Sequence, residues 1–297
     1  MKELIEQLTE VYGPSGREEQ IREVIRAEVE SLADEIRVDA LGNLIAVKKG
    51  TGQGKKVILA AHMAEIGLII SHVDEKGFLR AQRIGGVDPI TLTGGRVQFA
   101  DGTIGVIAPE KRPEFRKDPD LSKLYIDVGA TSRAEAADRL GQAVGFVRPF
   151  TDLGNRVVAK AMDDRIGCVV LIETMRRLGN SPHDLYFVFT VQEEVGLRGA
   201  QTGAYGVDPD VGIAVDVTVA ADTPEAYKMA MKLGHGPCIK VKDGRMLSHP
   251  GLKDLLIETA EANEIPYQLE VLAWGSTDAA AIQLSRGGVP AGCVSIA

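Results

Sequence analysis

The spacing of apolar residues predicts two amphipathic helices at the start of the chain. The first covers residues 2–12 and the second covers residues 18–32, where apolar side chains recur on one helical face. The residues on that face are Ile21, Val24, Ile25, Val29 and Leu32. Between the helices, Gly13-Pro14-Ser15-Gly16 breaks the pattern, and Ser15 followed by Glu18 is typical of a capping box.

The pattern then changes to that of strands. Residues 36–39 and 44–47 are strand-like on either side of a turn, and the all-apolar run at 57–61 predicts a strand buried on both faces. From about residue 68 to 158, short β-like runs alternate with turn residues, which is typical of a small β-rich module. Within it, the charged stretch 110–120 is expected to be a mobile loop.

Helices and strands alternate again after Asp163. The expected helices cover 167–178 and 252–262, and the expected strands cover 185–191, 211–215, 267–271 and 289–296. The simplest architecture is an α/β fold that is interrupted in sequence. Residues 1–67 and 159–297 would form an αβα sandwich that carries the site, and residues 68–158 would form an inserted, barrel-like β-rich domain.

Composition and charge narrow the possible functions. Hydrophobic residues make up 44% of the 297, yet no apolar run reaches the roughly 18–20 residues that a membrane-spanning helix needs. The N-terminus lacks the hydrophobic stretch of a signal peptide, so a cytoplasmic location is expected. The three cysteines are far apart, which argues against disulfides and thiolate zinc sites. A net charge of −8 argues against nucleic-acid binding.

Four segments combine apolar runs with residue types that bind metal ions, and ligand sites of open α/β sheets lie at the carboxyl ends of strands. The candidates are His62, the pair Asp163-Asp164, the pair Glu193-Glu194, and Asp216. Imidazole and carboxylate groups together suit zinc or a neighbouring divalent metal. Each feature also has an ordinary explanation, such as a structural histidine, helix capping by the aspartates or a solvated glutamate loop. Their joint occurrence favours a metal site.

Such a site could contain two metals roughly 3.5–4 Å apart, which polarise a carbonyl and lower the pKa of a bridging water. One glutamate of the pair would then be free to act as general base on that water.

These segments resemble motifs of the M42 peptidases, the tetrahedral aminopeptidases, some of whose relatives are labelled glucanase or cellulase. The similar segments are Val11–Gly16, Ala61–Gly67, Ala161–Gly167, Val191–Ala200 and Gly275–Ala279. The resemblance covers nearly the whole chain and implies a zinc-peptidase-like sandwich. It implies that His62 and Asp216 bind one metal, that Glu194 binds the other, that Asp163 bridges both, and that Glu193 is the general base.

The resemblance also implies two divalent ions per subunit, zinc or cobalt, and peptides as substrates. It implies a homo-oligomer, a hollow dodecamer that the inserted domain helps to assemble. Thr277 and Asp278 resemble family positions near the substrate.

Two departures from the family pattern bear on activity. The family motif reads His-x-Asp-Glu, and its Asp orients the histidine, but here that position is Ala64. Loss of such a group typically costs 10- to 100-fold in metal affinity or activity. Glu65 is adjacent but is expected to point elsewhere. Ala64→Asp is therefore expected to raise metal affinity with little effect on the fold, since the position is expected at the polar rim of the site.

The second departure is at the end of the sequence. Relatives place a last metal-binding histidine beyond the strand represented by 289–296, whereas this sequence ends at Ala297. The second metal site is therefore expected to be weak or empty. Either the sequence is truncated relative to the native protein, or it is that of a degenerate homologue.

The main functional hypothesis is a metalloaminopeptidase that removes N-terminal residues from short peptides by means of metal-activated water. The alternative is a catalytically inactive homologue that serves as a scaffold or assembly subunit. It is favoured by Ala64 and by the absence of the last metal-binding histidine. It is opposed by the presence of Asp163, Glu193, Glu194 and Asp216. A glycosidase is disfavoured because adjacent glutamates within a metal set cannot flank a sugar bond.

Overall fold

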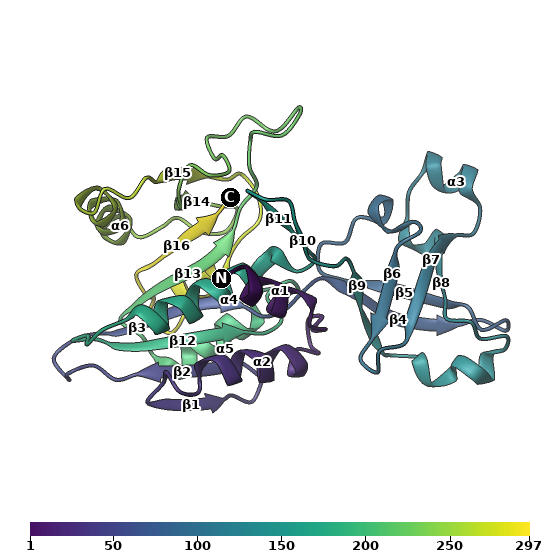
Figure 1. The fold of residues 1–297 in the computed structure, drawn as a ribbon, viewed down its shortest axis with the longest axis horizontal. Coiled ribbons are helices and arrows are strands. Elements are labelled where there is room, and N and C mark those ends of the chain that lie inside the picture. The colour runs from purple at the N-terminus through teal and green to yellow at the C-terminus, as the bar shows by residue number, and fades with distance from the viewer.

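The computed structural model describes residues 1–297 and contains an eight-stranded mixed sheet in the order β1-β2-β12-β3-β13-β16-β14-β15 (Figure 1). The strands are β1 (Glu35–Val38), β2 (Leu44–Lys48), β3 (Lys56–His62), β12 (Asp184–Thr190), β13 (Val211–Val217), β14 (Cys238–Lys242), β15 (Gln268–Val271) and β16 (Ala291–Ile296). The four central strands β12, β3, β13 and β16 are parallel, so their carboxyl ends lie at one edge of the sheet.

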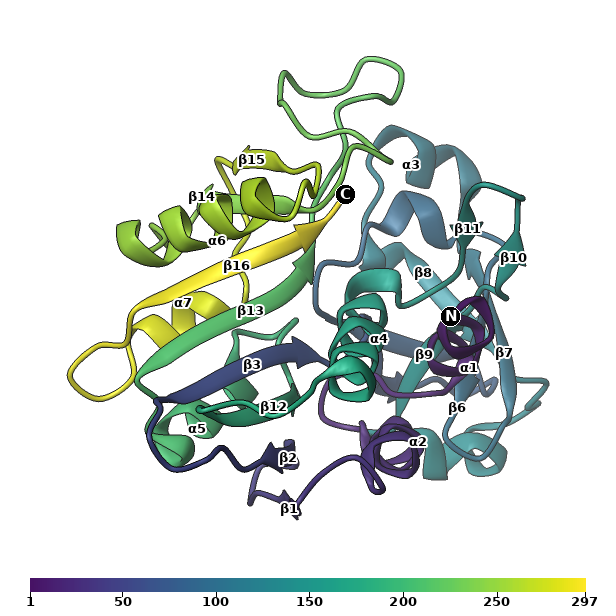
Figure 2. The same cartoon turned by 60° about the vertical axis from the view of Figure 1, so that its left-hand side comes forward.

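Helices cover both faces of this sheet (Figure 2). One face packs against α1 (Lys2–Glu10), α2 (Glu19–Val29) and α4 (Met162–Arg177), and the other packs against α5 (Arg198–Val207) and α7 (Asp278–Gln283). A further helix, α6 (Pro250–Ala262), contacts β14 and β16. Strand β12 shows why the central strands have continuous apolar sequences, since both of its faces are buried. Phe187 and Phe189 join the core under α4, while Val188 joins the core under α5.

The chain between β3 and α4 forms a separate closed barrel in the order β4-β5-β8-β7-β6-β9 (Figure 1). Its strands are β4 (Gly67–Val73), β5 (Leu79–Ile84), β6 (Arg96–Phe99), β7 (Ile104–Pro109), β8 (Leu124–Asp127) and β9 (Ala143–Val147). Short 3₁₀ helices cover Pro89–Leu92, Leu121–Lys123 and Arg133–Arg139, and the hairpin of β10 (Thr151–Asp152) and β11 (Val157–Val158) leads back to α4. The barrel has its own buried core, which includes Leu79, Val97 and Phe99. The predicted fold class, an α/β sandwich with an inserted β barrel, is confirmed.

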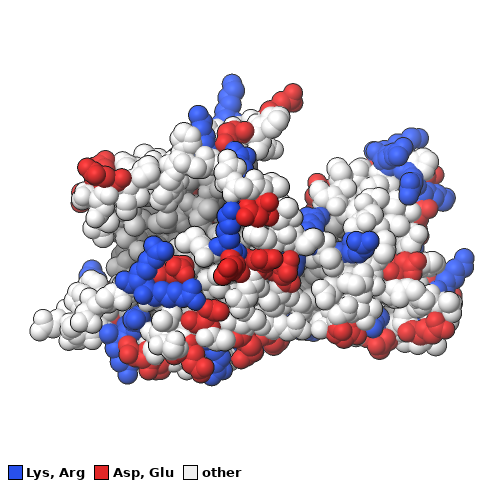
Figure 3. Space-filling model, in the orientation of Figure 1, with Lys and Arg blue, Asp and Glu red and all other residues white.

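The charged stretch predicted to be a loop contains a helix, α3 (Arg112–Lys117). The prediction was wrong because Phe115 is buried in the barrel core and anchors the helix, whereas charged neighbours dominate the sequence pattern. On the face drawn in Figure 3, Lys and Arg side chains gather over this end of the barrel. Elsewhere on that face both signs of charge are interspersed.

The predicted capping box at the start of α2 does not form. The Ser15 hydroxyl has no hydrogen-bond partner, and Glu18 instead accepts hydrogen bonds from the backbone N–H groups of Gly16 and Gln192. Glu18 is buried, and it connects this loop to the residue after Val191 rather than capping its own helix. None of the helices is long and apolar enough to cross a lipid bilayer.

Candidate active site

Three neighbouring parallel strands and one helix bring the predicted site residues together. His62 is the last residue of β3, Glu193 and Glu194 follow β12, and Asp216 lies near the end of β13. Asp163 lies at the start of α4, which packs on β3 and β13. The sheet order therefore places side chains that are up to 154 residues apart at one edge.

His62 is at the centre of this group. Its Nε2 lies 2.9 Å from Asp163 Oδ1 and 3.7 Å from Glu193 Oε2. Potential ligand atoms of His62, Asp163 and Glu194 lie within 4.8 Å of one another, and so do those of His62, Asp164 and Asp216. Two candidate metal-binding sets thus share one imidazole.

Asp164 is a site residue that the sequence reasoning left without a role. Its carboxylate is fully buried and accepts hydrogen bonds from the backbone N–H groups of His62 (3.2 Å) and Gly167 (3.0 Å). The side chain of Asp163, in contrast, is 56% exposed. The paired aspartates were visible in the sequence, but which carboxylate turns into the core depends on the backbone, which is non-helical at both residues.

The site concentrates negative charge that no side chain neutralises fully. Burial, together with neighbouring carboxylates, raises the pKa of Glu193 to about 8 and that of Glu194 to about 7. Burial also raises the pKa of Asp164 and Asp216. For His62, burial lowers the pKa, but the Glu193 and Asp163 carboxylates outweigh it and the net shift is upward. Clustered carboxylates beside an imidazole favour the binding of positive charge, and these oxygen and nitrogen donors fit a divalent cation.

A cavity of about 780 Å³ opens above these residues. Its floor includes His62, Asp163 and Glu193, and its walls include Arg245, Trp274 and Thr277. Asp278, by contrast, is buried behind the cavity, where its Oδ2 accepts a hydrogen bond from the Thr190 hydroxyl at 2.5 Å. The cavity is open and large enough for the end of a peptide.

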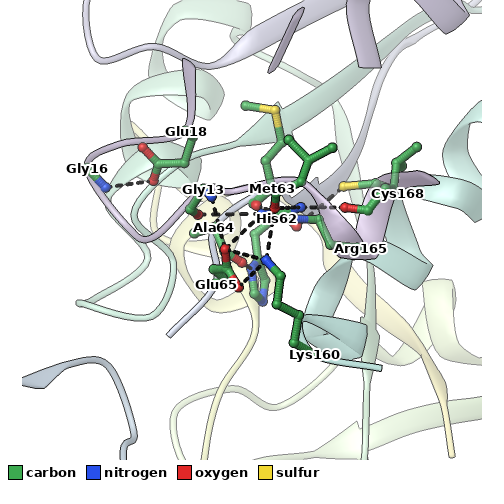
Figure 4. A network of polar contacts seen from close by, with 12 residues as sticks. Gly13, Gly16, Glu18, His62, Met63, Ala64, Glu65, Lys160, Arg165 and Cys168 are labelled. Atoms are coloured by element: carbon green, nitrogen blue, oxygen red, sulfur yellow. Dashed lines mark hydrogen bonds and ion pairs between the residues drawn. The ribbon is translucent and has the colours of Figure 1, made fainter. Parts of the chain in front are cut away.

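Ala64 does not leave His62 without an orienting acceptor. The Nδ1 atom of His62 lies 3.1 Å from the backbone carbonyl oxygen of Ala64. Glu65 points away from the site, as expected from the sequence, and its carboxylate accepts hydrogen bonds from Gly13 and Lys160 (Figure 4). Ala64 is fully buried, so the expectation that it lies at a polar rim was wrong.

Comparison with known proteins identifies the family of this chain. The family described as M42 glutamyl aminopeptidase matches residues 42–297. A putative aminopeptidase of Acetivibrio thermocellus is 48% identical over 298 residues, covering 100% of this chain and 90% of that protein. The structure of aminopeptidase APDkam598 from Desulfurococcus kamchatkensis is 43% identical, with a TM-score of 0.94 over 99% of this chain and 85% of that one.

The TET1 peptidase of Pyrococcus horikoshii, which can assemble into a tetrahedron or a large octahedral shell, is 34% identical. Its TM-score is 0.84, over 99% of this chain and 89% of that chain. The family match and these relatives agree: the chain belongs to the M42 family of aminopeptidases.

Proposed function

We propose that this protein is a metal-dependent aminopeptidase that hydrolyses the N-terminal residue from short peptides. The observation that carries the proposal is the convergence of His62 with carboxylates from three other segments on the floor of an open cavity. Neutral imidazole and ionised carboxylates are the donor groups of catalytic zinc sites.

Four residues would hold the metal ions, zinc or cobalt. His62 and Asp216 would bind one ion, Glu194 would bind the other, and Asp163 would bridge them, a role supported by its 2.9 Å approach to His62. Bound divalent ions would supply Lewis acidity, which polarises a carbonyl and lowers the pKa of water. Asp164 would fix the position of His62 relative to α4, since its carboxylate accepts a hydrogen bond from the backbone N–H of His62.

Glu193 would be the general base. Its side chain is only 11% exposed, it lines the cavity, and its Oε2 lies 3.7 Å from His62 Nε2. A water molecule would lose a proton to this carboxylate as its oxygen attacks the carbonyl carbon of the first peptide bond. The carboxylic acid would then return that proton to the leaving nitrogen as the carbon–nitrogen bond breaks.

The alternative, a catalytically inactive scaffold, has less support. Ala64 was one of its two arguments from the sequence, but the Ala64 carbonyl accepts the His62 hydrogen bond in place of a carboxylate. A scaffold would also have no need of a buried glutamate beside the ligands.

We also propose that the protein is a homo-oligomer, a dodecamer by analogy with the TET1 dodecamer, whose structure is 34% identical to this chain. Residues 1–67 and 159–297 would form the catalytic domain. The inserted domain, residues 68–158, would mediate assembly, since it has its own core and projects from the sandwich (Figure 1).

The test is hydrolysis by the purified protein after loading with zinc or cobalt. A panel of aminoacyl p-nitroanilides and short peptides with free or acetylated N-termini serves as substrate. Only free N-termini should react, and a chelator should abolish the reaction until metal is restored. If the protein binds two metals yet hydrolyses no residue type, the scaffold function replaces the enzyme.

A further inference from the structure

We propose that Glu65, clamped by Lys160 and Arg165, is a positioning residue for His62. These three residues form a buried ionic cluster that fixes the peptide segment around Ala64. The Ala64 carbonyl in turn orients the His62 imidazole. This positioning role rests on the proposed function only in so far as the opposite ring nitrogen is assigned to a metal.

The two ring nitrogens of His62 face different kinds of partner. Nδ1 meets the Ala64 carbonyl oxygen at 3.1 Å, and a carbonyl can only accept, so Nδ1 must carry the proton of this bond. Nε2 faces the carboxylates of Asp163 and Glu193. When the ring is neutral, the carbonyl therefore selects the tautomer that leaves the Nε2 lone pair for a cation, a role usually taken by a group behind the ligand.

A carbonyl is a good orienting group only if its peptide is immobile. The Met63 N–H donates to Thr190 at 2.8 Å, and the Glu65 N–H donates to the Gly13 carbonyl at 3.1 Å. In return, the Ser15 N–H donates to the Glu65 carbonyl at 3.1 Å. The segment is thus held between the end of β12 and the loop that follows α1.

The side chain of Glu65 strengthens this attachment (Figure 4). It is 2% exposed, and one of its oxygens accepts from the Gly13 N–H at 2.9 Å. Lys160 Nζ lies 2.8 Å from each of its oxygens, and Arg165 Nη2 lies 3.8 Å away. The acid is therefore paired on two sides within the protein interior.

The same two cations hold the residues on either side of Ala64. Lys160 also donates to the Val11 carbonyl at 2.9 Å. Arg165 Nε donates to the Met63 carbonyl at 2.5 Å (Figure 4). Met63 and Glu65 are thus both fastened to residues 160–165, which lie directly around Asp163. The cluster couples the position of the His62 imidazole to that of the segment bearing another proposed ligand.

Burying three charges is costly, and apolar residues could hold a fold as well or better. A positioning role explains the cluster, but a simple long-range charge effect on the metal is the rival explanation. The two explanations predict opposite changes in cation affinity when Lys160 is replaced. If charge alone matters, removing the Lys160 cation strengthens cation binding and removing the Glu65 anion weakens it. If position matters, both changes weaken binding, since each releases the Ala64 segment.

The experiment compares zinc affinity, by competition with a chromophoric chelator, in wild type, Glu65→Gln and Lys160→Met. Both variants should bind zinc about 10-fold or more weakly, the range found for groups behind metal-bound histidines. Arg139→Met is the control, because it removes an ion pair of 2.8 Å with Asp101 in the barrel, remote from His62. It should leave zinc affinity unchanged.

A second measurement does not depend on metal. In histidine-selective ¹⁵N NMR of the metal-free protein, the Nδ1 proton of His62 should exchange slowly with solvent in wild type and Arg139→Met. It should exchange faster in Glu65→Gln and Lys160→Met.

Tighter zinc binding by Lys160→Met overturns the inference, as does a protected Nδ1 proton in both variants. Should Glu65→Gln fail to fold, the sign of the Lys160→Met effect still decides. If wild type binds no zinc or cobalt, the proposed function fails, while the proton exchange rates still test the positioning role.

Discussion

A backbone carbonyl accepts the hydrogen bond from His62 that a carboxylate would accept at position 64. This changes what Ala64→Asp is expected to do. The position is fully buried beside the buried Glu65, so a new carboxylate there would be desolvated and repelled. We expect the free energy of unfolding to fall by at least about 1–3 kcal/mol, with little gain in zinc affinity. Urea denaturation and zinc titration check this, with Ala64→Ser as the uncharged control. A stable variant that binds zinc markedly tighter would contradict it.

Glu193→Gln separates catalysis from metal binding. The change keeps the shape of the side chain but removes its proton affinity, so turnover of a peptide p-nitroanilide should fall about 10²–10⁴-fold. Metal content, measured by elemental analysis, should stay close to that of wild type. Glu194→Gln is the matched comparison and should lose metal instead. The assignment of the two neighbours would be reversed if Glu193→Gln were the variant that lost metal.

The carboxylates of the site also predict how stability depends on pH. Burial raises the pKa of Glu194 to about 7 and that of Glu193 to about 8 in the folded protein. Between their ordinary range near 4.5 and these values, the folded state binds more protons than the unfolded state, so stability falls as pH rises. The melting temperature of the metal-free protein should therefore decrease from pH 5 to pH 8. Added zinc should remove most of this decrease, because it would bind ionised Glu194 and its positive charge would favour the ionised form of Glu193 nearby. A melting temperature of the metal-free protein that rises over this range would contradict the raised pKa values of Glu193 and Glu194.

Among the elements around the site, the turn after β12 depends on the N-terminal loop. Gln192 has a positive φ of 54°, and its N–H donates to the buried Glu18 carboxylate at 2.8 Å. Glu18→Ala should leave this N–H without its partner and lower stability by about 1–3 kcal/mol. Because Glu193 follows directly, kcat should fall as well. Glu19→Ala changes an exposed neighbour and serves as the control, with an effect well below that of Glu18→Ala in both assays.

Periodicity predicted the elements whose burial follows a simple pattern. The apolar run 57–61 became β3, and residues 185–191 became β12, with starts and ends close to those expected. Helix α5 was missed because its sequence contains three glycines, and it is held by packing against α7 and β12. Strand β14 was missed because Lys240 looks exposed, yet it is buried and paired with Glu270. Local sequence does not report such long-range partners.

The candidate ligands were readable for a related reason. Each stands next to an element that the sequence predicts, and the tendency of open α/β sheets to gather ligands at the carboxyl ends of their strands was enough to group them. The Ala64 carbonyl was not readable, since a backbone acceptor has no side-chain signature. Lys160 and Arg165 were also missed, because a charged residue in sequence gives no sign that its partner, Glu65, is buried with it.

At the scale of the whole molecule, the proposed assembly function of the barrel can be tested by introducing charged residues on its exposed apolar surface. Ile90 and Leu140 are barrel residues that are 63% and 59% exposed. If the barrel mediates assembly, Ile90→Lys combined with Leu140→Lys should shift the protein from large oligomers toward smaller species in sedimentation velocity. Leu284→Lys changes a residue on the sandwich that is 76% exposed and is the control. Dissociation by Leu284→Lys alone would place the assembly surface on the sandwich.

The inserted barrel also dictates an order of events during synthesis. Strand β3 pairs with β12 and β13, and β12 begins at Asp184, more than a hundred residues after His62. At about 5–20 residues per second, a ribosome needs about 6–25 s to make that stretch. During this time the barrel strands are completed at Val147, while the apolar β3 has no partner and is prone to aggregate. The nascent chain must therefore keep β3 from sticking to other chains until the second half of the sheet emerges. His62 is therefore synthesised early but can join the other site residues only after β12 and β13 have been synthesised.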